Sequence, residues 1–182
     1  DMKLAVCPPN INVSNFQFTV NEAEEILYGI GAIKGVGEAA IEDLLRERKT
    51  NGPFTGLYDL CKRVDLRKVN RRVFEALIRG GAFDTFNDNR ASHMAELPRA
   101  IKVAERHVKM AEVGQNDLFG LAVNAESQDD EIKDYANNVA IWPEKERLAF
   151  EKLALGLFLT GHPIDQYWPE LQNIVHGSIA KT

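Results

Sequence analysis

Four closely spaced glycines form the stretch of this sequence that is best suited to bind a ligand; they are Gly29, Gly31, Gly35 and Gly37. Apolar residues at helical spacing follow from Ala39 to Leu45, which predicts a helix directly after the glycines. Glycine permits a tight turn and the close approach of a ligand to the backbone. Because the unbonded amides at a helix N-terminus favour an anion, the chemistry indicated here is phosphate binding.

Three kinds of phosphate site use glycines in this way. A dinucleotide fold needs G-x-G-x-x-G after a buried strand, and here Lys34 stands where the third glycine is required. A phosphate loop needs Gly-Lys-Ser/Thr, which is absent. A helix-hairpin-helix has the form apolar-x-Gly-apolar-Gly, and Ile33-Lys34-Gly35-Val36-Gly37 fits it. Such a hairpin holds a DNA backbone phosphate without reading bases, and an ordinary glycine turn is the alternative.

Basic residues are concentrated around this hairpin. The chain has a net charge of −5, made up of −3 for residues 1–25, +4 for 26–82 and −6 for 83–182. A basic section between acidic ones is the asymmetry expected of a local nucleic-acid footprint.

A second basic feature is the run from Lys62 to Arg72, in which six of 11 residues are Lys or Arg. It lies between two predicted short helices. We interpret it as a second phosphate-contacting hairpin that uses charge instead of glycines, and a solvated helix rim is the alternative. The DNA contacts predicted in this run are Lys62, Arg63, Arg67, Lys68, Asn70, Arg71 and Arg72.

Hydrophobic periodicity predicts a mainly α fold with a short N-terminal β-hairpin, in which residues 16–20 pair with 26–28. The predicted helices are Glu38–Arg48, 57–64 capped by Thr55, Asn70–Arg79, a long helix from Arg90 that is kinked or broken at Pro98 and fades by Gly114, and Glu144–Leu159 with its leucines buried. A small helix is expected in the tail.

Residues 114–140 are polar and acidic, and they contain one short motif with large apolar side chains, Gln115-Asn116-Asp117-Leu118-Phe119. An exposed Leu-Phe pair is costly unless something covers it. Leu118 and Phe119 either fill this protein's own core or anchor a linear peptide in a partner's pocket, with Gln115 hydrogen-bonding beside them.

The sequence shows no constellation that would predict catalysis or a metal cofactor. Its four histidines are isolated from one another, and Cys7 and Cys61 belong to no ligand cluster. Two lone cysteines suggest a reducing cytosol, so we expect a cytoplasmic protein. No apolar run approaches the ~20 residues of a membrane span, so no membrane association is expected.

Taken together, these stretches resemble the alpha-subunit family of bacterial DNA polymerase III, the C-family replicative polymerases. The matching stretches are YGIGAIKGVGEAA at 28–40, GPF at 52–54, DLRKVNRR at 65–72, GAFD at 81–84 and GHP at 161–163. The resemblance implies a fragment: the end of the fingers (1–25), a tandem helix-hairpin-helix domain (26–113), an acidic segment with a clamp-binding peptide (114–140) and a helix leading toward the oligonucleotide-binding fold (141–182).

The same resemblance implies partners and excludes chemistry. The hairpins are expected to hold duplex DNA, and Gln115, Asp117, Leu118 and Phe119 to bind the sliding clamp, the beta subunit. Other holoenzyme subunits are expected to bind elsewhere in the parent. The catalytic aspartates and their Mg²⁺ belong to the family's palm, so we expect no polymerase activity in this stretch. A free-standing repair or recombination adaptor and a small nucleotide-dependent enzyme are the alternatives.

Overall fold

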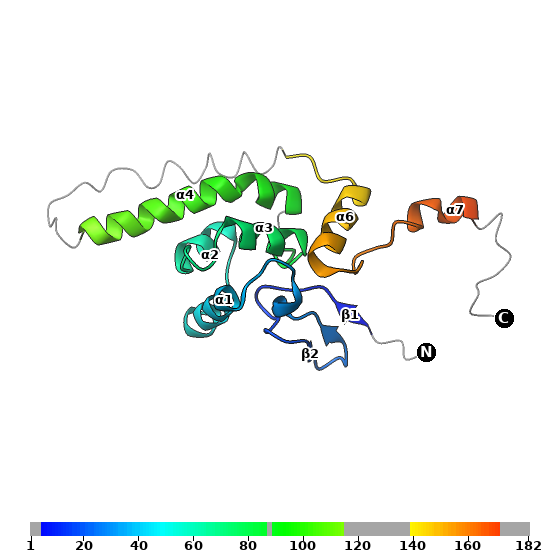
Figure 1. The fold of residues 1–182 in the computed structure, drawn as a ribbon, viewed down its shortest axis with the longest axis horizontal. Helices are drawn as coiled ribbons and strands as arrows, with labels where there is room; N and C mark the ends of the chain where they lie inside the picture. The colour runs from blue at the N-terminus through cyan, green and yellow to red at the C-terminus, as the bar shows by residue number, and fades with distance from the viewer. Residues whose placement is uncertain (1–4, 87–88, 115–138, 172–182) are drawn as a thin grey trace.

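The computed structural model describes residues 5–86, 89–114 and 139–171 of the 182-residue chain (Figure 1). It confirms the predicted fold class, because helices form most of this part of the chain and the few short strands lie at its N-terminal end. Within the described ranges, every helix is too short or too polar to traverse a lipid bilayer.

The N-terminal sheet has three two-residue strands in the order β1-β3-β2: β1 (Val6–Cys7), β2 (Thr19–Val20) and β3 (Ile26–Leu27). The predicted hairpin is confirmed, since β2 runs antiparallel to β3 with Val20 opposite Ile26. The parallel pairing of β1 with β3 was not predicted, because a strand of two residues carries no alternating pattern.

Three helices follow the sheet: α1 (Glu38–Asn51), α2 (Leu57–Arg63) and α3 (Arg71–Arg79). α1 begins where predicted but ends three residues later, at Asn51, because the next residue, Gly52, has a φ of 82° that stops the helix. The capping role predicted for Thr55 is wrong: Gly56 is the N-cap of α2. The Asp59 carboxylate in the first turn accepts the Thr55 N–H at 3.0 Å instead.

α4 (Arg90–Gly114) passes through Pro98 as one helix, so the predicted break is not found. Pro98 is exposed, while Leu97 and Ala100 are buried against the helices beneath it. Burial of the inner face holds the helix together, and the hydrogen bond that proline cannot make is lost on the solvent side.

α6 (Glu144–Leu155) ends four residues earlier than predicted, because Gly156 takes the left-handed conformation, with φ 84°. Leu148 and Leu155 are buried, but Leu153 is 67% exposed and Leu157 is also exposed, contrary to the prediction. The remaining helical elements are short: η1 (Ile30–Ala32), η2 (Asp165–Tyr167) and α7 (Trp168–Leu171).

One hydrophobic core runs through most of the described chain. It includes Ile11 and Tyr28 near the sheet, Phe74 and Leu77 on α3, and Leu155 at the end of α6. α2 and α3 pack on α4, and α6 packs on α3 (Figure 1). α6 and the glycine hairpin therefore share one hydrophobic core.

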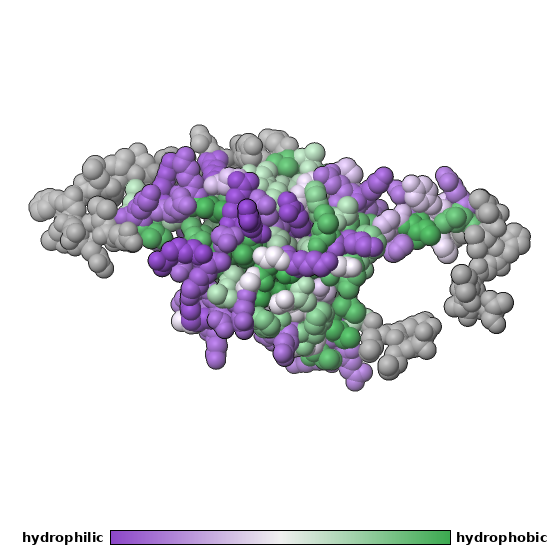
Figure 2. All heavy atoms as spheres, viewed as in Figure 1, coloured by the Kyte–Doolittle hydropathy of each residue, from purple (hydrophilic) through white to green (hydrophobic). Residues whose placement is uncertain are grey.

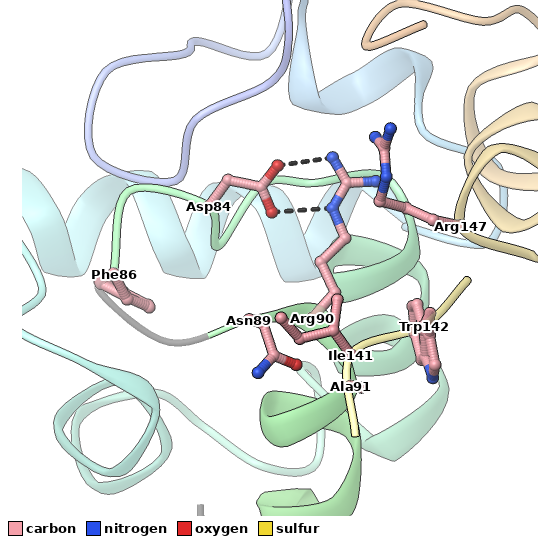
Figure 3. A pocket seen from close by; sticks show the side chains of 8 residues that line it. All are labelled: Asp84, Phe86, Asn89, Arg90, Ala91, Ile141, Trp142 and Arg147. Carbon is pink, nitrogen blue, oxygen red and sulfur yellow. Dashed lines mark hydrogen bonds and ion pairs between the residues drawn. The ribbon is translucent and has the colours of Figure 1, made fainter. Parts of the chain in front are cut away.

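A buried charge network fixes α6 in place. The Arg90 guanidinium is 5% exposed and donates to both Asp84 oxygens, at 2.8 and 2.5 Å (Figure 3). It also donates to Glu151 Oε2 at 3.2 Å and to the Arg79 carbonyl at 3.2 Å. Gly81 lies against this guanidinium with φ 84°, so a side chain there would be strained and would collide with it.

Glu151 is fully buried and accepts several hydrogen bonds besides that of Arg90. The Leu159 N–H, the Thr160 N–H and the Thr160 hydroxyl donate to it at 2.5, 2.9 and 2.6 Å. Burial alone would raise the pKa of Glu151, but the donated hydrogen bonds, with the charge of Arg90, hold that pKa below its ordinary value of 4.5.

Removing the Glu151 carboxylate is predicted to destabilise the fold strongly. Glu151→Ala leaves the buried Arg90 guanidinium short of one partner, which typically costs about 3–5 kcal/mol of unfolding free energy. Urea denaturation measures it. As a control, Glu146→Ala replaces an exposed glutamate on the same helix, and it should leave the midpoint of urea denaturation unchanged.

The same carboxylate predicts the direction of acid sensitivity. Because the folded pKa of Glu151 is depressed, its stabilisation is present above its ordinary pKa of 4.5 and is lost as the pH falls through the folded value. The loss of stability below pH 4.5 should be shallower in Glu151→Gln than in the parent chain. Equal slopes would contradict this assignment.

Candidate nucleic-acid interface

The first two glycines of the motif serve the packing of the chain against itself. A Cβ at Gly29 would lie 2.6 Å from the Gln17 carbonyl carbon, and a Cβ at Gly31 would lie 2.7 Å from the Phe16 oxygen. The Gly31 N–H donates to that oxygen at 2.9 Å. These two glycines are therefore explained by the close approach of the segment before β2, with no ligand required.

The third glycine serves a turn. Gly35 has a φ of 88°, and the Val36 N–H donates to the Ile33 carbonyl at 3.2 Å, which closes a four-residue turn. Ile33 and Val36 point into the core, while Lys34 and Gly35 are exposed. The apolar-x-Gly-apolar-Gly pattern thus gives a tight hairpin with two buried anchors and an exposed tip.

Neither packing nor backbone conformation explains the fourth glycine. Gly37 has φ −80° and ψ 155°, which any residue can adopt, and a Cβ there would meet nothing within 4 Å. It is the N-cap of α1 but offers no side-chain hydrogen bond to the first turn. Because Gly37, Glu38 and Ala39 are exposed, the first amides of α1 are open to an anion.

The end of α6 supports the hairpin from inside. The Lys34 N–H donates to the Ala154 carbonyl at 2.8 Å, and the Tyr28 hydroxyl donates to the Leu155 carbonyl at 2.9 Å. The Lys34 ammonium lies beside Gly156, the C-cap of α6, since a Cβ built on that glycine would be 3.6 Å from Lys34 Nζ. A cation is favoured at the C-terminus of a helix. Burial raises the pKa of Tyr28, which keeps the donated proton in place.

The second hairpin is organised by a carboxylate instead of glycines. The Asp65 carbonyl accepts the N–H groups of Lys68 and Val69, both at 2.9 Å, and Val69 is fully buried. The Asp65 carboxylate accepts the Arg67 N–H at 3.0 Å and its Nε at 3.1 Å. The hydrogen bond from the Arg67 side chain, followed by that from its backbone, lowers the pKa of Asp65.

The two hairpins differ in what happens to the helix amides behind them. Asn70 is the N-cap of α3, and its side-chain oxygen accepts the Arg72 N–H at 3.0 Å and the Val73 N–H at 3.3 Å. These amides already have an acceptor, whereas the corresponding cap of α1 is Gly37, which has none to offer. A phosphate at the second hairpin would therefore depend on side-chain charge.

One buried carboxylate connects the hairpins. Asp43 on α1 is 2% exposed, and its Oδ2 accepts the Asp65 N–H at 2.8 Å. Its Oδ1 lies 3.9 Å from Lys68 Nζ and also pairs with Arg46. The helix that begins at the first hairpin therefore holds the backbone of the second.

The basic run divides into structural and exposed members. Arg63 is 17% exposed; its guanidinium donates to the Gly52 carbonyl at 2.8 Å and to Asp59 and Glu47 at 3.1 Å, and it lies 4.5 Å from the Phe54 ring centroid. Arg63 was predicted to contact DNA, which stays a prediction, and sequence reasoning missed that this side chain joins α1, α2 and the loop between them.

The other basic residues of the run lie at the surface. Lys62 and Arg72 are exposed and make no ion pair within the described ranges, while Arg71 pairs with Glu75 at 2.9 Å. Arg67 and Lys68 are held by the aspartates of the second hairpin. These five side chains and the first hairpin therefore offer exposed cationic and amide groups to a phosphate backbone.

Two expectations concern other parts of the chain. The predicted clamp-binding residues Gln115, Asp117, Leu118 and Phe119 lie outside the described residues. Among the residues that the structure does describe, no group of three or more His, Cys, Asp or Glu could hold a metal ion. Burial raises the pKa of the Cys61 thiol to about 12, as expected of a core cysteine.

Sequence comparison shows which known proteins this chain resembles. The helix-hairpin-helix motif family matches residues 3–93. DNA polymerase III subunit alpha of Pasteurella multocida is 50% identical over 93% of this chain, that of Vibrio cholerae 46% over 94%, and that of Escherichia coli K12 47% over 97%. The chain spans only 14–15% of the length of these relatives. The resemblance to the alpha-subunit family of DNA polymerase III that was inferred from the sequence is therefore confirmed, and this chain corresponds to only a section of such a subunit.

The placement of Arg63 predicts that it matters for folding. Arg63→Ala leaves three carbonyls and two carboxylates without this donor and should lower the unfolding free energy by about 2–3 kcal/mol. Thermal or urea unfolding measures the loss. Lys62→Ala, the exposed neighbour, should unfold like the parent; equal losses for both would contradict a structural role specific to Arg63.

Proposed function

Because this chain belongs to the helix-hairpin-helix motif family, we propose that it is the DNA-holding section of a replicative DNA polymerase alpha subunit. It grips duplex DNA by the phosphate backbone and reads no bases. The observation that carries this proposal is Gly37, the one glycine of its motif that the protein's own packing and backbone leave unexplained. A ligand that approaches the α1 amides closely would supply the missing reason.

The geometry of the first hairpin suits a phosphate. The buried side chains of Ile33 and Val36 hold the turn, and the open N-terminus of the 14-residue helix α1 presents amides and a positive dipole end. Lys34 adds its charge beside the tip but is directed toward the end of α6. The Glu38 carboxylate in the first turn is the one group here that opposes an anion.

The second hairpin contributes through long-range charge. Lys62 lies at the end of α2, and Arg67, Lys68, Arg71 and Arg72 lie in the hairpin and first turn of α3, whose amides are already capped by Asn70. Contacts of this kind are sequence-independent and release counterions, so binding should weaken steeply with salt. In this proposal Arg63 and Asn70 position the surface, while the five exposed cations touch DNA.

The parent protein would be a DNA-directed DNA polymerase, a nucleotidyltransferase acting in DNA replication in the cytoplasm. The present stretch would carry none of the catalysis, with the catalytic aspartates and their Mg²⁺ in another part of the parent. We assign residues 1–25 to the end of the fingers, 26–113 to the hairpin domain and 114–140 to a tether segment. Residues 141–182 lead onward to the oligonucleotide-binding fold and begin with a helix that supports the first hairpin.

The tether segment is proposed to bind the sliding clamp. Gln115, Asp117, Leu118 and Phe119 have the order of a linear peptide with two apolar anchors and an amide beside them. A tether of this kind raises the local concentration of DNA at the grip without adding a contact to it. Other holoenzyme subunits would bind elsewhere in the parent.

Substitution of Gly37 should separate stability from DNA binding. Gly37→Asn supplies the side-chain acceptor that α1 lacks and recreates the Asn70 arrangement, so the fold should become equally or slightly more stable. The same side chain occupies the amides and should lower duplex affinity by about tenfold, the effect of losing one charge-assisted contact. Fluorescence anisotropy at several salt concentrations measures the affinity.

Gly56→Asn is the matched control. Gly56 is the N-cap of α2, has an extended φ of 173°, and has open space where a Cβ would be. Asparagine there should leave α2 equally or slightly more stable, as at α1, and should leave DNA affinity unchanged. Unchanged duplex binding by Gly37→Asn would reject the phosphate cradle.

The tether makes a separate prediction. Replacing Leu118 and Phe119 with Ala should abolish binding to the sliding clamp, because apolar anchors supply most of the affinity of such peptides. Surface plasmon resonance against immobilised clamp measures this. Duplex affinity of the same variant should equal that of the parent chain. Clamp binding that survives the double substitution would refute the tether.

A further inference from the structure

α4 carries a basic ridge that no step of the proposed DNA grip uses. The ridge consists of Arg99, Lys102, Arg106 and Lys109, spaced by three, four and three residues. This spacing places the four side chains on one face of the helix. The ten residue steps from the first to the last span about 15 Å along the axis.

The ridge lies away from the core. The buried residues of this part of α4, Leu97, Ala100 and Ala104, follow the helical period on the opposite side. Lys102, Arg106 and Lys109 are exposed and Arg99 is partly so. Figure 2 shows many hydrophilic residues over the α4 region, with some hydrophobic ones among them.

The charge of the ridge is not balanced locally. Between residues 97 and 110 there are four Lys or Arg and one acid, Glu105, although the chain from 83 to 182 carries a net charge of −6. None of the four cations makes an ion pair within the described ranges. A solvated surface in an acidic region normally mixes both signs, so this ridge points to an anionic partner.

A groove connects the ridge to the second hairpin. A cavity of about 560 Å³ lies between the hairpin residues Val64–Arg67 and the α4 residues Glu105, Val108 and Lys109. Arg67 and Lys109 line it from opposite sides, and Asp65 and Glu105 are its acidic members. The groove therefore joins the second hairpin to α4, with one cation contributed by each side.

We propose that the α4 basic ridge extends the DNA grip, so that the phosphate backbone held at the hairpins continues across the groove and along Lys102 and Lys109. The partner is the backbone of the same duplex, because its evenly spaced phosphates match a linear row of cations and because the groove joins the row to the hairpin. This inference rests on the proposed DNA grip and adds about 15 Å, or roughly four base pairs, to its footprint.

The test compares two double variants of the full chain. Lys102→Gln with Lys109→Gln removes two ridge charges, and Lys49→Gln with Lys145→Gln removes two equally exposed lysines from α1 and α6. Duplex affinity is measured against salt concentration and against duplex length. The ridge variant should lose about 1.8 from the slope of log affinity against log salt, and its affinity should stop rising at a duplex shorter by roughly four base pairs.

The control variant should keep the parent's slope and length dependence. A ridge variant that matches the parent in both would overturn the inference, and so would equal losses in ridge and control variants, since these would report net charge alone. Gly37→Asn in the same assay separates the two proposals. If Gly37→Asn weakens binding while the ridge variant does not, the grip stands and the ridge is excluded from it; if Gly37→Asn has no effect, the grip itself fails.

Discussion

The arrangement of this molecule depends on the buried pair between Arg90 at the start of α4 and Glu151 on α6. Two charges withdrawn from water are costly unless nearly every polar atom finds a partner. Here Asp84, the Arg79 carbonyl, and the amides and hydroxyl near Thr160 provide those partners. Because so few placements of α6 satisfy all of them, the pair selects one position for that helix more than it adds net stability.

The position of α6 then determines the support of the first hairpin. Once Glu151 is held, the last turn of α6 brings two unpaired helix carbonyls to the hairpin, where the Lys34 N–H and the Tyr28 hydroxyl meet them. A helix C-terminus needs such donors as much as a helix N-terminus needs acceptors. The exposed tip at Gly35 therefore rests on a set of contacts that begins more than 100 residues later in the sequence.

Local features of the fold could be predicted from sequence, and features made by distant contacts could not. The starts of α1 and α3 and the β2–β3 hairpin follow from glycines, helical periodicity and alternation within a few residues, whereas the capping role of Asn70 emerges only from the structure. Glu151 lies in a run that reads as an ordinary charged helix, and nothing near it indicates a partner 61 residues away. The roles of Arg63 and Asp43 were hidden for the same reason, since charge is visible in a sequence but its neighbours are not.

Within the candidate site, too, residues that look alike in the sequence have different roles in the structure. Four glycines looked alike in the sequence, yet two serve the approach of a neighbouring segment, one serves a positive φ, and only Gly37 serves neither. The two hairpins also looked alike in purpose, yet Asn70 satisfies the amides that Gly37 leaves open. A capping side chain at Gly37 would stabilise α1 by the usual argument for helix ends. Its absence leaves the helix amides without an acceptor from the protein at an exposed and well-supported point of the molecule, and a donor held rigidly in place and open to solvent is what a phosphate oxygen can pair with.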